Sequence, residues 1–533
     1  MQMSSLAPIL RSFPARFVPR WLPVLLFCSV AAAQAPTHEA FRAMHVDAGK
    51  VVGQIRSFQG VNGAPLPVIA GLPDLVEQYK DLRVDQVRTH DIMGPTDVDA
   101  HFDYKDPNLT WLIPEFDQRA RVVAAGNAGV IFPDSAADPE KPESYNFAPT
   151  DKVIASIRAA GAEVYYRVGR SWGADYTPPK DFDKFANVVK HVAMHYNQGW
   201  ANGFHDQIRY WEFWNEPEGF WTGTPEQFFS LYEKTARALK SVDPALKVGG
   251  DARAMPFDDG PYREGLLDYC AAHNVPLDFY SWHAYSHSSA DPYDGVRLAK
   301  ANRAIIDAHG FPKAESILSE WNLTPDFTEV AKPELQGIHT AAFIGAAMSY
   351  FQDAPLDHAH FYRGDAVWMG LFNLQGEPYK PALAFRAMGM MQDTPQRLAV
   401  EGTDTFGFAG LAGRSAEGKT VQILLSNYAI TGKEIHLAQK PAELRKPGSA
   451  VNWGVFKSLP LRTDIVYQDN AGYNLVVNNL PWGNGAFTIK RYRISKKQSM
   501  EMVEEKVGKG GNVKLSNSLA PDTIELIVLQ QKR

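Results

Sequence analysis

Residues 209–217 read RYWEFWNEP, an aromatic-rich run that ends at a proline. Alternation along an extended strand places Glu212 and Glu216 on the same face. The strand ends at the turn that begins with Pro217, and side chains no longer alternate strictly there. Asn215 can therefore also lie on the side of Glu216. The stretch therefore predicts a strand that ends in a carboxylate.

Similar β-rich runs alternate with amphipathic helical patterns from about residue 50 to residue 395. Strands are expected at Gln54–Val61, Val84–His90, Glu163–Gly169, Arg209–Glu216, Lys247–Asp251, Asp278–Tyr285, Ser316–Asn322 and His358–Arg363. Helices are expected at Leu72–Asp81, Thr150–Ala160, Asp181–Tyr196, Pro225–Val242, Tyr262–Ala272, Asp294–His309 and Leu335–Gln352. Strands that alternate with helices form parallel sheets, and eight such units close into a barrel. We predict an α/β fold with a (β/α)8 barrel; an open, doubly wound sheet is the alternative.

The two ends of the chain differ from this middle part. After about residue 395, short β-rich runs follow one another between turns, which predicts an accessory β-sandwich. At the N-terminus, arginines precede a short apolar run and then small residues at the spacing of a signal peptidase site. We expect a signal peptide at 1–35, the barrel at 36–395 and the sandwich at 396–533. The protein should then be secreted or periplasmic, with no membrane attachment after cleavage.

Composition narrows the possible partners. The net charge of −6 and the pI of about 6.2 give no reason to expect a nucleic-acid partner. Cleavage would remove Cys28 and leave Cys270 as a lone thiol, so a large core must stabilise the fold. No cofactor is expected, because Gly508–Asn512 follows no strand and opens no helix, unlike a phosphate loop. No metal is expected either, because no cluster with ligand spacing surrounds His90 or His283.

A second predicted strand also ends in a carboxylate: residues 316–322 read SILSEWN and include Glu320. The C-terminal ends of parallel barrel strands converge on one site, and Glu216 and Glu320 end the fourth and seventh predicted strands. Hydrolysis of a glycosidic bond requires two carboxyl groups that face each other across the anomeric carbon. Either glutamate alone is compatible with a solvated turn. The pair, with an Asn and a Trp beside each, predicts a carbohydrate-cleaving enzyme.

The same motifs resemble those of glycoside hydrolase family 39, which includes β-xylosidases and α-L-iduronidases. The resemblance extends from about Arg56 to Leu529, nearly the whole mature chain. The residues that carry it are Arg88-Thr89-His90, Asn146-Phe147, Trp214-Asn215-Glu216-Pro217 with Phe220-Trp221, Ser281-Trp282-His283-Ala284-Tyr285, Ser319-Glu320-Trp321-Asn322 and the closing stretch Leu519–Leu529.

This resemblance implies that Glu216 is the general acid/base, Glu320 the nucleophile and Asn215 the ligand of the sugar hydroxyl beside the anomeric carbon. Local sequence favours the same roles, because an acid must keep its proton and Glu216 has the more apolar neighbours. A retaining mechanism follows, with the carboxyl groups ~5 to 5.5 Å apart. Other substrate contacts are expected at strand ends: Arg88, His90, Trp172, Asp251, His283, Tyr285, Trp321 and Trp368, with Trp282, Tyr362 and Arg363 as further candidates.

The leading expectation is a β-xylosidase acting on a carbohydrate substrate. The sugar-binding loops depart from the familiar family pattern, because Glu218-Gly219 follow the NEP motif where an Asn is expected and the loop Gly94–Asn146 is long. Galactosidase, arabinosidase, iduronidase and exopolysaccharide hydrolase activities therefore stay open. The rival of another class is a noncatalytic carbohydrate-binding protein on a barrel scaffold. Such a protein would lose one carboxylate, whereas both glutamates are present here.

Overall fold

The computed structural model describes residues 41–66, 72–102, 116–254, 261–285, 291–323, 332–367, 369–430 and 470–532. Eight parallel strands form a closed barrel in chain order. They are β2 (Gly60–Asn62), β3 (Gln86–Arg88), β4 (Glu163–Val168), β5 (Tyr210–Phe213), β6 (Lys247–Arg253), β7 (Phe279–Tyr285), β8 (Glu315–Asn322) and β9 (His358–Phe361). Because β2 pairs with both β3 and β9, the predicted barrel is confirmed and the open-sheet alternative is wrong.

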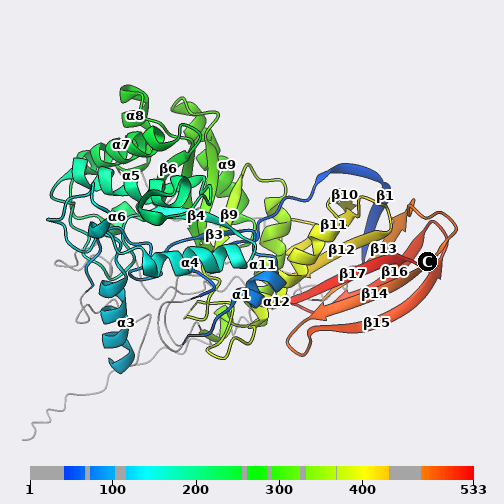
Figure 1. Cartoon of the computed structure of the whole chain (residues 1–533). Helices are drawn as coiled ribbons and strands as arrows, with labels where there is room; N and C mark the ends of the chain where they lie inside the picture. Colours follow the sequence, from blue (N-terminus) through cyan, green and yellow to red (C-terminus); the bar gives the residue numbers. More distant parts are fainter. Residues whose placement is uncertain are drawn as a thin grey trace, which may run out of the picture. The chain divides into compact units, whose positions relative to one another are not determined.

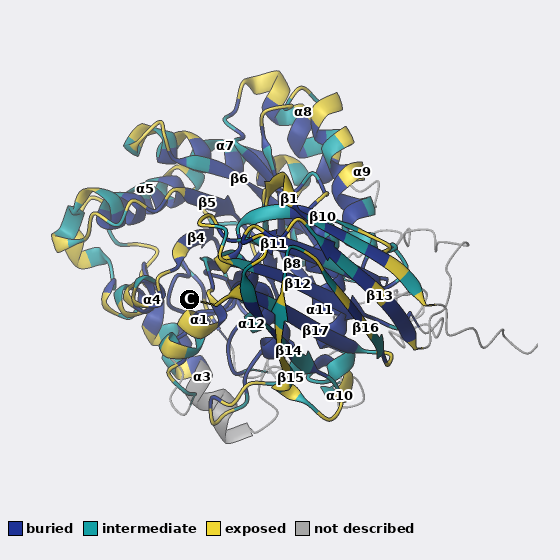
Figure 2. Ribbon diagram, turned by 90° about the vertical axis from the view of Figure 1, so that its right-hand side faces the viewer, coloured by how far each residue is buried: buried dark blue, intermediate teal, exposed yellow. Residues whose placement is uncertain are grey.

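Helices follow the barrel strands and cover them. They are α1 (Val76–Leu82), α3 (Phe116–Gly129), α4 (Ala148–Ala159), α5 (Phe182–Gln198), α6 (Pro217–Phe220), α7 (Pro225–Val242), α8 (Arg263–His273), α9 (Asp294–Ala308), α10 (Lys332–Leu335), α11 (Ile338–Phe351) and α12 (Lys380–Met390). The start of α7 is fixed by a capping box, in which Thr224 and Gln227 exchange side-chain to backbone hydrogen bonds. Figure 2 shows buried strands and exposed outer helix surfaces. Among the described helices, none is long and apolar enough to cross a membrane.

The barrel interior is arranged in layers. Near the N-terminal ends of the strands, Tyr165, Tyr210, Phe279 and Ile317 form a small buried apolar cluster. The Tyr165 hydroxyl donates to Glu212, whose carboxylate belongs to a polar layer nearer the C-terminal ends. The apolar layer therefore supports a charged one, which lies where barrel enzymes place their chemistry.

A second, nine-stranded sheet has the order β15-β14-β17-β12-β11-β10-β1-β13-β16. Its members are β1 (Arg42–Gln54), β10 (Gln396–Glu401), β11 (Phe408–Arg414), β12 (Thr420–Asn427), β13 (Ala471–Asn478), β14 (Ala486–Ile494), β15 (Ser499–Lys509), β16 (Val513–Leu519) and β17 (Thr523–Gln531). The sheet folds over itself, because Tyr473 of β13 and Asn517 of β16 both donate to Glu525 of β17. The predicted C-terminal β-rich unit is confirmed.

One strand of this sheet comes from the N-terminal side of the barrel. β1 pairs antiparallel with β10 and parallel with β13, and Figure 1 shows it in blue among the C-terminal strands. Met44, Val46 and Ala48 are buried and alternate with more exposed residues, which is the pattern of a half-buried strand. The expected barrel boundaries, 36–395, include this segment, whereas its hydrogen bonds belong to the accessory sheet.

Candidate active site

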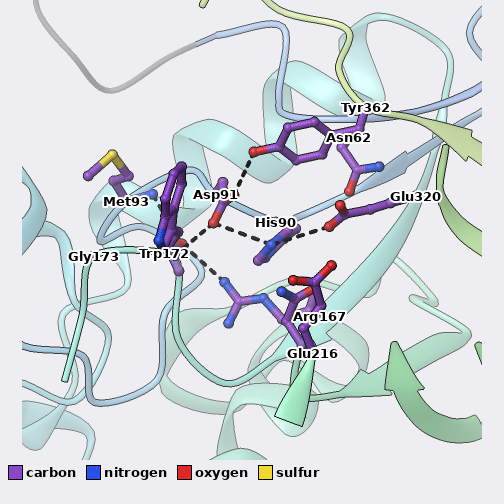
Figure 3. A network of polar contacts seen from close by, with 12 residues as sticks. Asn62, His90, Asp91, Met93, Arg167, Trp172, Gly173, Glu216, Glu320 and Tyr362 are labelled. Atoms are coloured by element: carbon purple, nitrogen blue, oxygen red, sulfur yellow. Dashed lines mark hydrogen bonds and ion pairs between the residues drawn. The ribbon is translucent and has the colours of Figure 1, made fainter. Parts of the chain in front are cut away.

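Glu216 and Glu320 lie together at the C-terminal end of the barrel. Glu216 follows β5 and precedes α6, with a left-handed φ of 44°, and Glu320 is in β8. One carboxylate oxygen of each and one ring nitrogen of His283 lie within 4.8 Å of one another. The two side chains are 14% and 6% exposed. Figure 3 shows their carboxylates facing each other, so the structure brings together two residues that are far apart in the sequence.

Glu320 is surrounded by hydrogen-bond donors. Arg88 Nη1 donates to Oε1 and the Tyr285 hydroxyl donates to Oε2, each at 2.7 Å. His90 Nε2 lies 3.4 Å from Oε1. Burial raises the pKa of Glu320, while Arg88 and Tyr285 hold it down. These donors stabilise the ionised form that a nucleophile requires.

Arg88 joins several strands through one guanidinium. Its Nε donates to Glu212 at 2.5 Å, its Nη1 to Asn62 at 3.0 Å and its Nη2 to Asn215 Oδ1 at 2.8 Å. Arg88 and Glu212 are completely buried. Burial opposes the charge of Arg88, but Glu212 and Glu320 raise its pKa above the usual value. Neither Asn62 nor Glu212 is among the site residues expected from the sequence, although strand alternation places Glu212 on the face of Glu216.

Glu216 has a different environment. His283 Nδ1 lies 2.7 Å from Glu216 Oε1, compared with 3.6 Å from Glu320 Oε2. Burial raises the pKa of Glu216 well above its usual value, and the charges of Glu320 and Glu218 raise it further. The two carboxyl groups influence each other's ionisation, and the charge that has hydrogen-bond donors is that of Glu320. This environment favours the protonated form of Glu216 and the ionised form of Glu320.

Asp91 organises one side of the site and was not identified from the sequence. Its Oδ1 accepts from the Trp172 amide and its Oδ2 from the Tyr362 hydroxyl, both at 2.8 Å. His90 Nε2 lies 3.3 Å from Oδ1 (Figure 3). Asp91 has a φ of 52°, in the left-handed region that aspartate tolerates better than most residues. The expected contacts His90 and Trp172, and the further candidate Tyr362, are thus held together by one carboxylate.

Three expected substrate contacts lie elsewhere. The Trp321 ring packs against Phe351 and Phe361 in the core, because the residue after inward-facing Glu320 must face outward. The same parity turns Trp282 outward. Asp251 is fully buried, and burial raises its pKa to about 7; the Arg253 charge lowers this pKa and the Glu218 charge raises it.

The two candidates that remain are Trp368 and Arg363. Trp368 lies outside the described residues. Arg363 is buried, and its Nε and Nη2 donate to the two carboxylate oxygens of Asp365 at 2.8 and 2.6 Å. Its Nη2 also donates to the backbone oxygen of Asp91, which places this ion pair beside the site.

A metal ion is geometrically conceivable where Glu216, His283 and Glu320 converge. The chemistry of the surroundings argues against it, because Arg88 is hydrogen-bonded to Glu320 and its positive charge would repel a cation. Proton transfer and nucleophilic attack fit this set better than metal ligation.

A barrel with glutamates at the ends of its fourth and seventh strands has the architecture of a glycoside hydrolase. The family model of glycosyl hydrolases family 39 matches residues 143–331, a range that contains both glutamates. A β-xylosidase from Geobacillus stearothermophilus is 31% identical over 225 residues, which are 36% of this chain and 44% of that protein, so the match spans less than half of its length.

Solved structures extend the comparison over the rest of the chain. A glucosidase from Croceicoccus marinus is 34% identical with a TM-score of 0.77, covering 92% of this chain and all of that one. A monomeric β-xylosidase from Caulobacter crescentus shares the fold, with 16% identity, a TM-score of 0.64 and coverage of 92% and 99%. The chain belongs to glycosyl hydrolase family 39, as its motifs predicted.

Proposed function

We propose that the protein hydrolyses O-glycosidic bonds by a retaining double displacement, with a neutral β-xyloside as the leading substrate. The observation that carries the mechanism is the approach of the Glu216 and Glu320 carboxylate oxygens to within 4.8 Å. Retaining enzymes hold their carboxyl groups ~5 to 5.5 Å apart, whereas inverting enzymes leave ~6.5 to 9.5 Å for a water molecule.

In the first step, a Glu320 oxygen forms a bond to the anomeric carbon while the bond from that carbon to the leaving oxygen breaks. Glu216 gives its proton to the leaving oxygen. In the second step, Glu216 takes a proton from water, the water oxygen attacks the anomeric carbon, and Glu320 leaves as a carboxylate. The high pKa of Glu216 suits the first role, and the donors on Glu320 suit both its attack and its departure.

Asn215 is oriented for the sugar by Arg88. Its Oδ1 accepts from Arg88 Nη2 at 2.8 Å, so its amide NH2 group is directed away from the guanidinium. We propose that this NH2 group donates to the sugar hydroxyl beside the anomeric carbon. A donor in that position strengthens its hydrogen bond as charge develops in the transition state.

Two arginines of the site, Arg88 and Arg363, are already paired with carboxylates of this chain. Arg88 is paired with Glu212 and Glu320, and Arg363 is engaged at Nε and Nη2 by Asp365. Within the described part of the site, neither arginine offers an unpaired fork to a substrate carboxylate. These two arginines therefore give no support to an iduronidase-like activity, and a xylosidase or glucosidase activity remains the proposal.

A glucosidase is the second candidate. The solved glucosidase is matched over 92% of this chain and all of its own length at 34% identity, whereas the β-xylosidase match covers less than half of that relative. A panel of nitrophenyl glycosides distinguishes the two by kcat/KM and includes the β-glucuronide as the charged case. Proton NMR of the first sugar released then tests the mechanism, because retention gives the β-anomer first from a β-glycoside. Release of the α-anomer first, or no hydrolysis of any member, would overturn the proposal.

We also propose that the protein is exported. Arg11, Arg16 and Arg20 precede the short apolar run, and small residues follow it, as in a cleaved signal peptide. Expression in a bacterial host followed by cell fractionation and N-terminal sequencing tests this. A start near Ala33 or Ala35 in the exported fraction is expected, and an intact N-terminus confined to the cytoplasm would contradict it.

A further inference from the structure

Glu212 occupies a position that the two-carboxylate mechanism does not use. It lies in β5, four residues before Glu216, and is completely buried. Its Oε2 accepts from Arg88 Nε at 2.5 Å and its Oε1 accepts from the Tyr165 hydroxyl at 3.1 Å. Arg88 in turn donates to Glu320 at 2.7 Å. One buried cation is therefore shared by two buried anions.

The reaction changes the charge of one of these anions. When Glu320 attacks the anomeric carbon, its carboxylate becomes an ester and loses its negative charge. Arg88 is completely buried and remains charged throughout, because a guanidinium does not deprotonate under these conditions. A buried cation without a counter-ion is strongly unfavourable. Of the two carboxylates that the described residues bring to Arg88, Glu212 alone keeps its charge during the lifetime of the ester.

We propose that Glu212 is a positioning residue that supplies the counter-ion of Arg88 while Glu320 is covalently occupied, and that it thereby stabilises the glycosyl-enzyme. The inference rests on the proposed double displacement. Before attack, Arg88 forms ion pairs with both Glu212 and Glu320. Arg88 therefore stabilises the Glu320 carboxylate less than it would without Glu212, and Glu320 stays reactive as a nucleophile. After attack, the bond to Glu212 remains and the guanidinium does not become an isolated buried charge.

The same contact fixes the direction of the guanidinium. With Nε held by Glu212, Nη1 faces Glu320 and Asn62, and Nη2 faces Asn215. Asn62 Nδ2 also donates to the backbone oxygen of Ser319 at 2.9 Å, which connects this arrangement to the strand that carries the nucleophile. Glu212 thus acts on both the charge and the geometry of Glu320 without approaching the sugar.

Charge and geometry have different kinetic consequences. Loss of the counter-ion makes ester formation harder, because Arg88 is left unpaired in the product of that step. The same loss makes ester hydrolysis easier, because the departing Glu320 carboxylate restores a partner to Arg88. Simple misplacement of Arg88 would slow both steps. The ratio of the two rates therefore separates the proposed role from a merely structural one.

The test uses Glu212→Gln in the full-length protein, with a 2-deoxy-2-fluoro glycoside that carries an activated leaving group. The rate of inactivation reports ester formation, and the return of activity after removal of excess reagent reports ester hydrolysis. We expect inactivation to slow by ~10- to 100-fold, while reactivation is unchanged or faster. Equal slowing of both rates, or no change in either, would overturn the proposal for Glu212.

Two matched variants complete the experiment. Tyr165→Phe removes the other hydrogen bond to Glu212 without changing its charge, so the ratio of the two rates should stay within about threefold of the wild type. Glu212→Asp keeps the charge and should preserve most of the wild-type ratio. This variant carries the test if the Gln variant does not fold, as judged by circular dichroism, because a ratio shifted by tenfold or more would then contradict the proposal.

The wild-type reaction distinguishes failure of this inference from failure of the proposed function. Peptide mass spectrometry should find the fluoro sugar on Glu320. Absence of any covalent adduct would contradict the proposed double displacement itself. An adduct on Glu320 whose formation and hydrolysis do not depend on the charge at position 212 would leave the mechanism in place and reject the role of Glu212.

Discussion

His283 Nδ1 lies 2.7 Å from Glu216 Oε1 and so links the acid/base candidate to a buried imidazole. Burial lowers the pKa of His283 well below its usual value, and Arg88 lowers it further. A neutral imidazole does not favour ionisation of Glu216 in the way that an imidazolium would. This contact therefore positions the carboxyl group while leaving it able to donate a proton and later to accept one.

We predict a bell-shaped dependence of kcat/KM on pH. The acid limb follows the ionisation of Glu320, and the basic limb follows the loss of the proton from Glu216. The pKa values of both groups are raised, that of Glu216 the more strongly because its charge lacks the donors that surround Glu320. The maximum of kcat/KM should therefore lie at a higher pH than it would for two exposed glutamates with ordinary pKa values. Initial rates on a nitrophenyl glycoside across the stable pH range test this, and a basic limb near the pKa of an exposed glutamate would contradict it.

Glu216→Gln should separate substrates by their leaving groups. Turnover of a poorly activated glycoside should fall by ~10²- to 10⁴-fold, because the leaving oxygen no longer receives a proton. A dinitrophenyl glycoside needs little help in the first step and should still form the ester. Added azide should then release the glycosyl azide with retained configuration. A noncatalytic binding protein would show none of these differences, so the experiment also tests that rival.

Glu320→Ala should remove nearly all turnover while leaving Glu216 in place. Azide can occupy the space of the lost carboxylate and attack the anomeric carbon directly, so an activated β-glycoside should yield the α-glycosyl azide. Product configuration is read by proton NMR. Glu163→Gln is the control, because this exposed glutamate lies at the opposite end of a barrel strand and its loss should not alter kcat/KM. An azide product of unchanged configuration would reverse the assignment of the two glutamates.

Removal of divalent metal ions should not change activity. Arg88 lies 2.7 Å from Glu320 and already supplies the positive charge that a cation would bring to the site. Prolonged dialysis against EDTA followed by assay in metal-free buffer should leave kcat/KM within about twofold of the starting value. Loss of activity that returns with one particular metal ion would show that Glu216, His283 and Glu320 act as ligands instead.

The sequence predicts the features that repeat along it. Each strand-helix unit can be recognised from its local pattern, and eight such units predict the barrel. The C-terminal ends of barrel strands converge, so two strands that end in glutamates predict the facing pair. Strand alternation alone does not exclude Trp321, because Ile317 faces the barrel interior and lies four residues earlier. A register shift in β8 between Leu318 and Trp321 turns Glu320 inward and Trp321 toward the helices.

Other features depend on contacts between distant segments. Asp91 is identified only when Trp172 and Tyr362 are brought to its carboxylate from two other strand ends. The placement of β1 in the accessory sheet depends on its pairing with β13, more than 400 residues later in the chain. The sequence predicts that Glu212 lies in a strand, but its proposed role depends on the hydrogen bond from Arg88, which comes from another barrel strand. Local periodicity contains none of this information.

The raised pKa of Glu216 also predicts a pH-dependent cost to stability. Because burial raises its pKa in the folded protein, the folded state retains a proton that the unfolded state has already lost above the pKa of an ordinary glutamate. Stability therefore falls as pH rises from that value to the folded pKa, by about 1.4 kcal/mol for each unit of difference. Glu216→Gln removes this titration, so the variant should melt at a higher temperature than the wild type near neutral pH. The difference in Tm should shrink as the pH is lowered toward the pKa of an exposed glutamate, and scanning calorimetry at several pH values measures it. A variant that is less stable at neutral pH, or a Tm difference that grows as the pH falls, would show that the Glu216 carboxylate is stabilised rather than strained in its site.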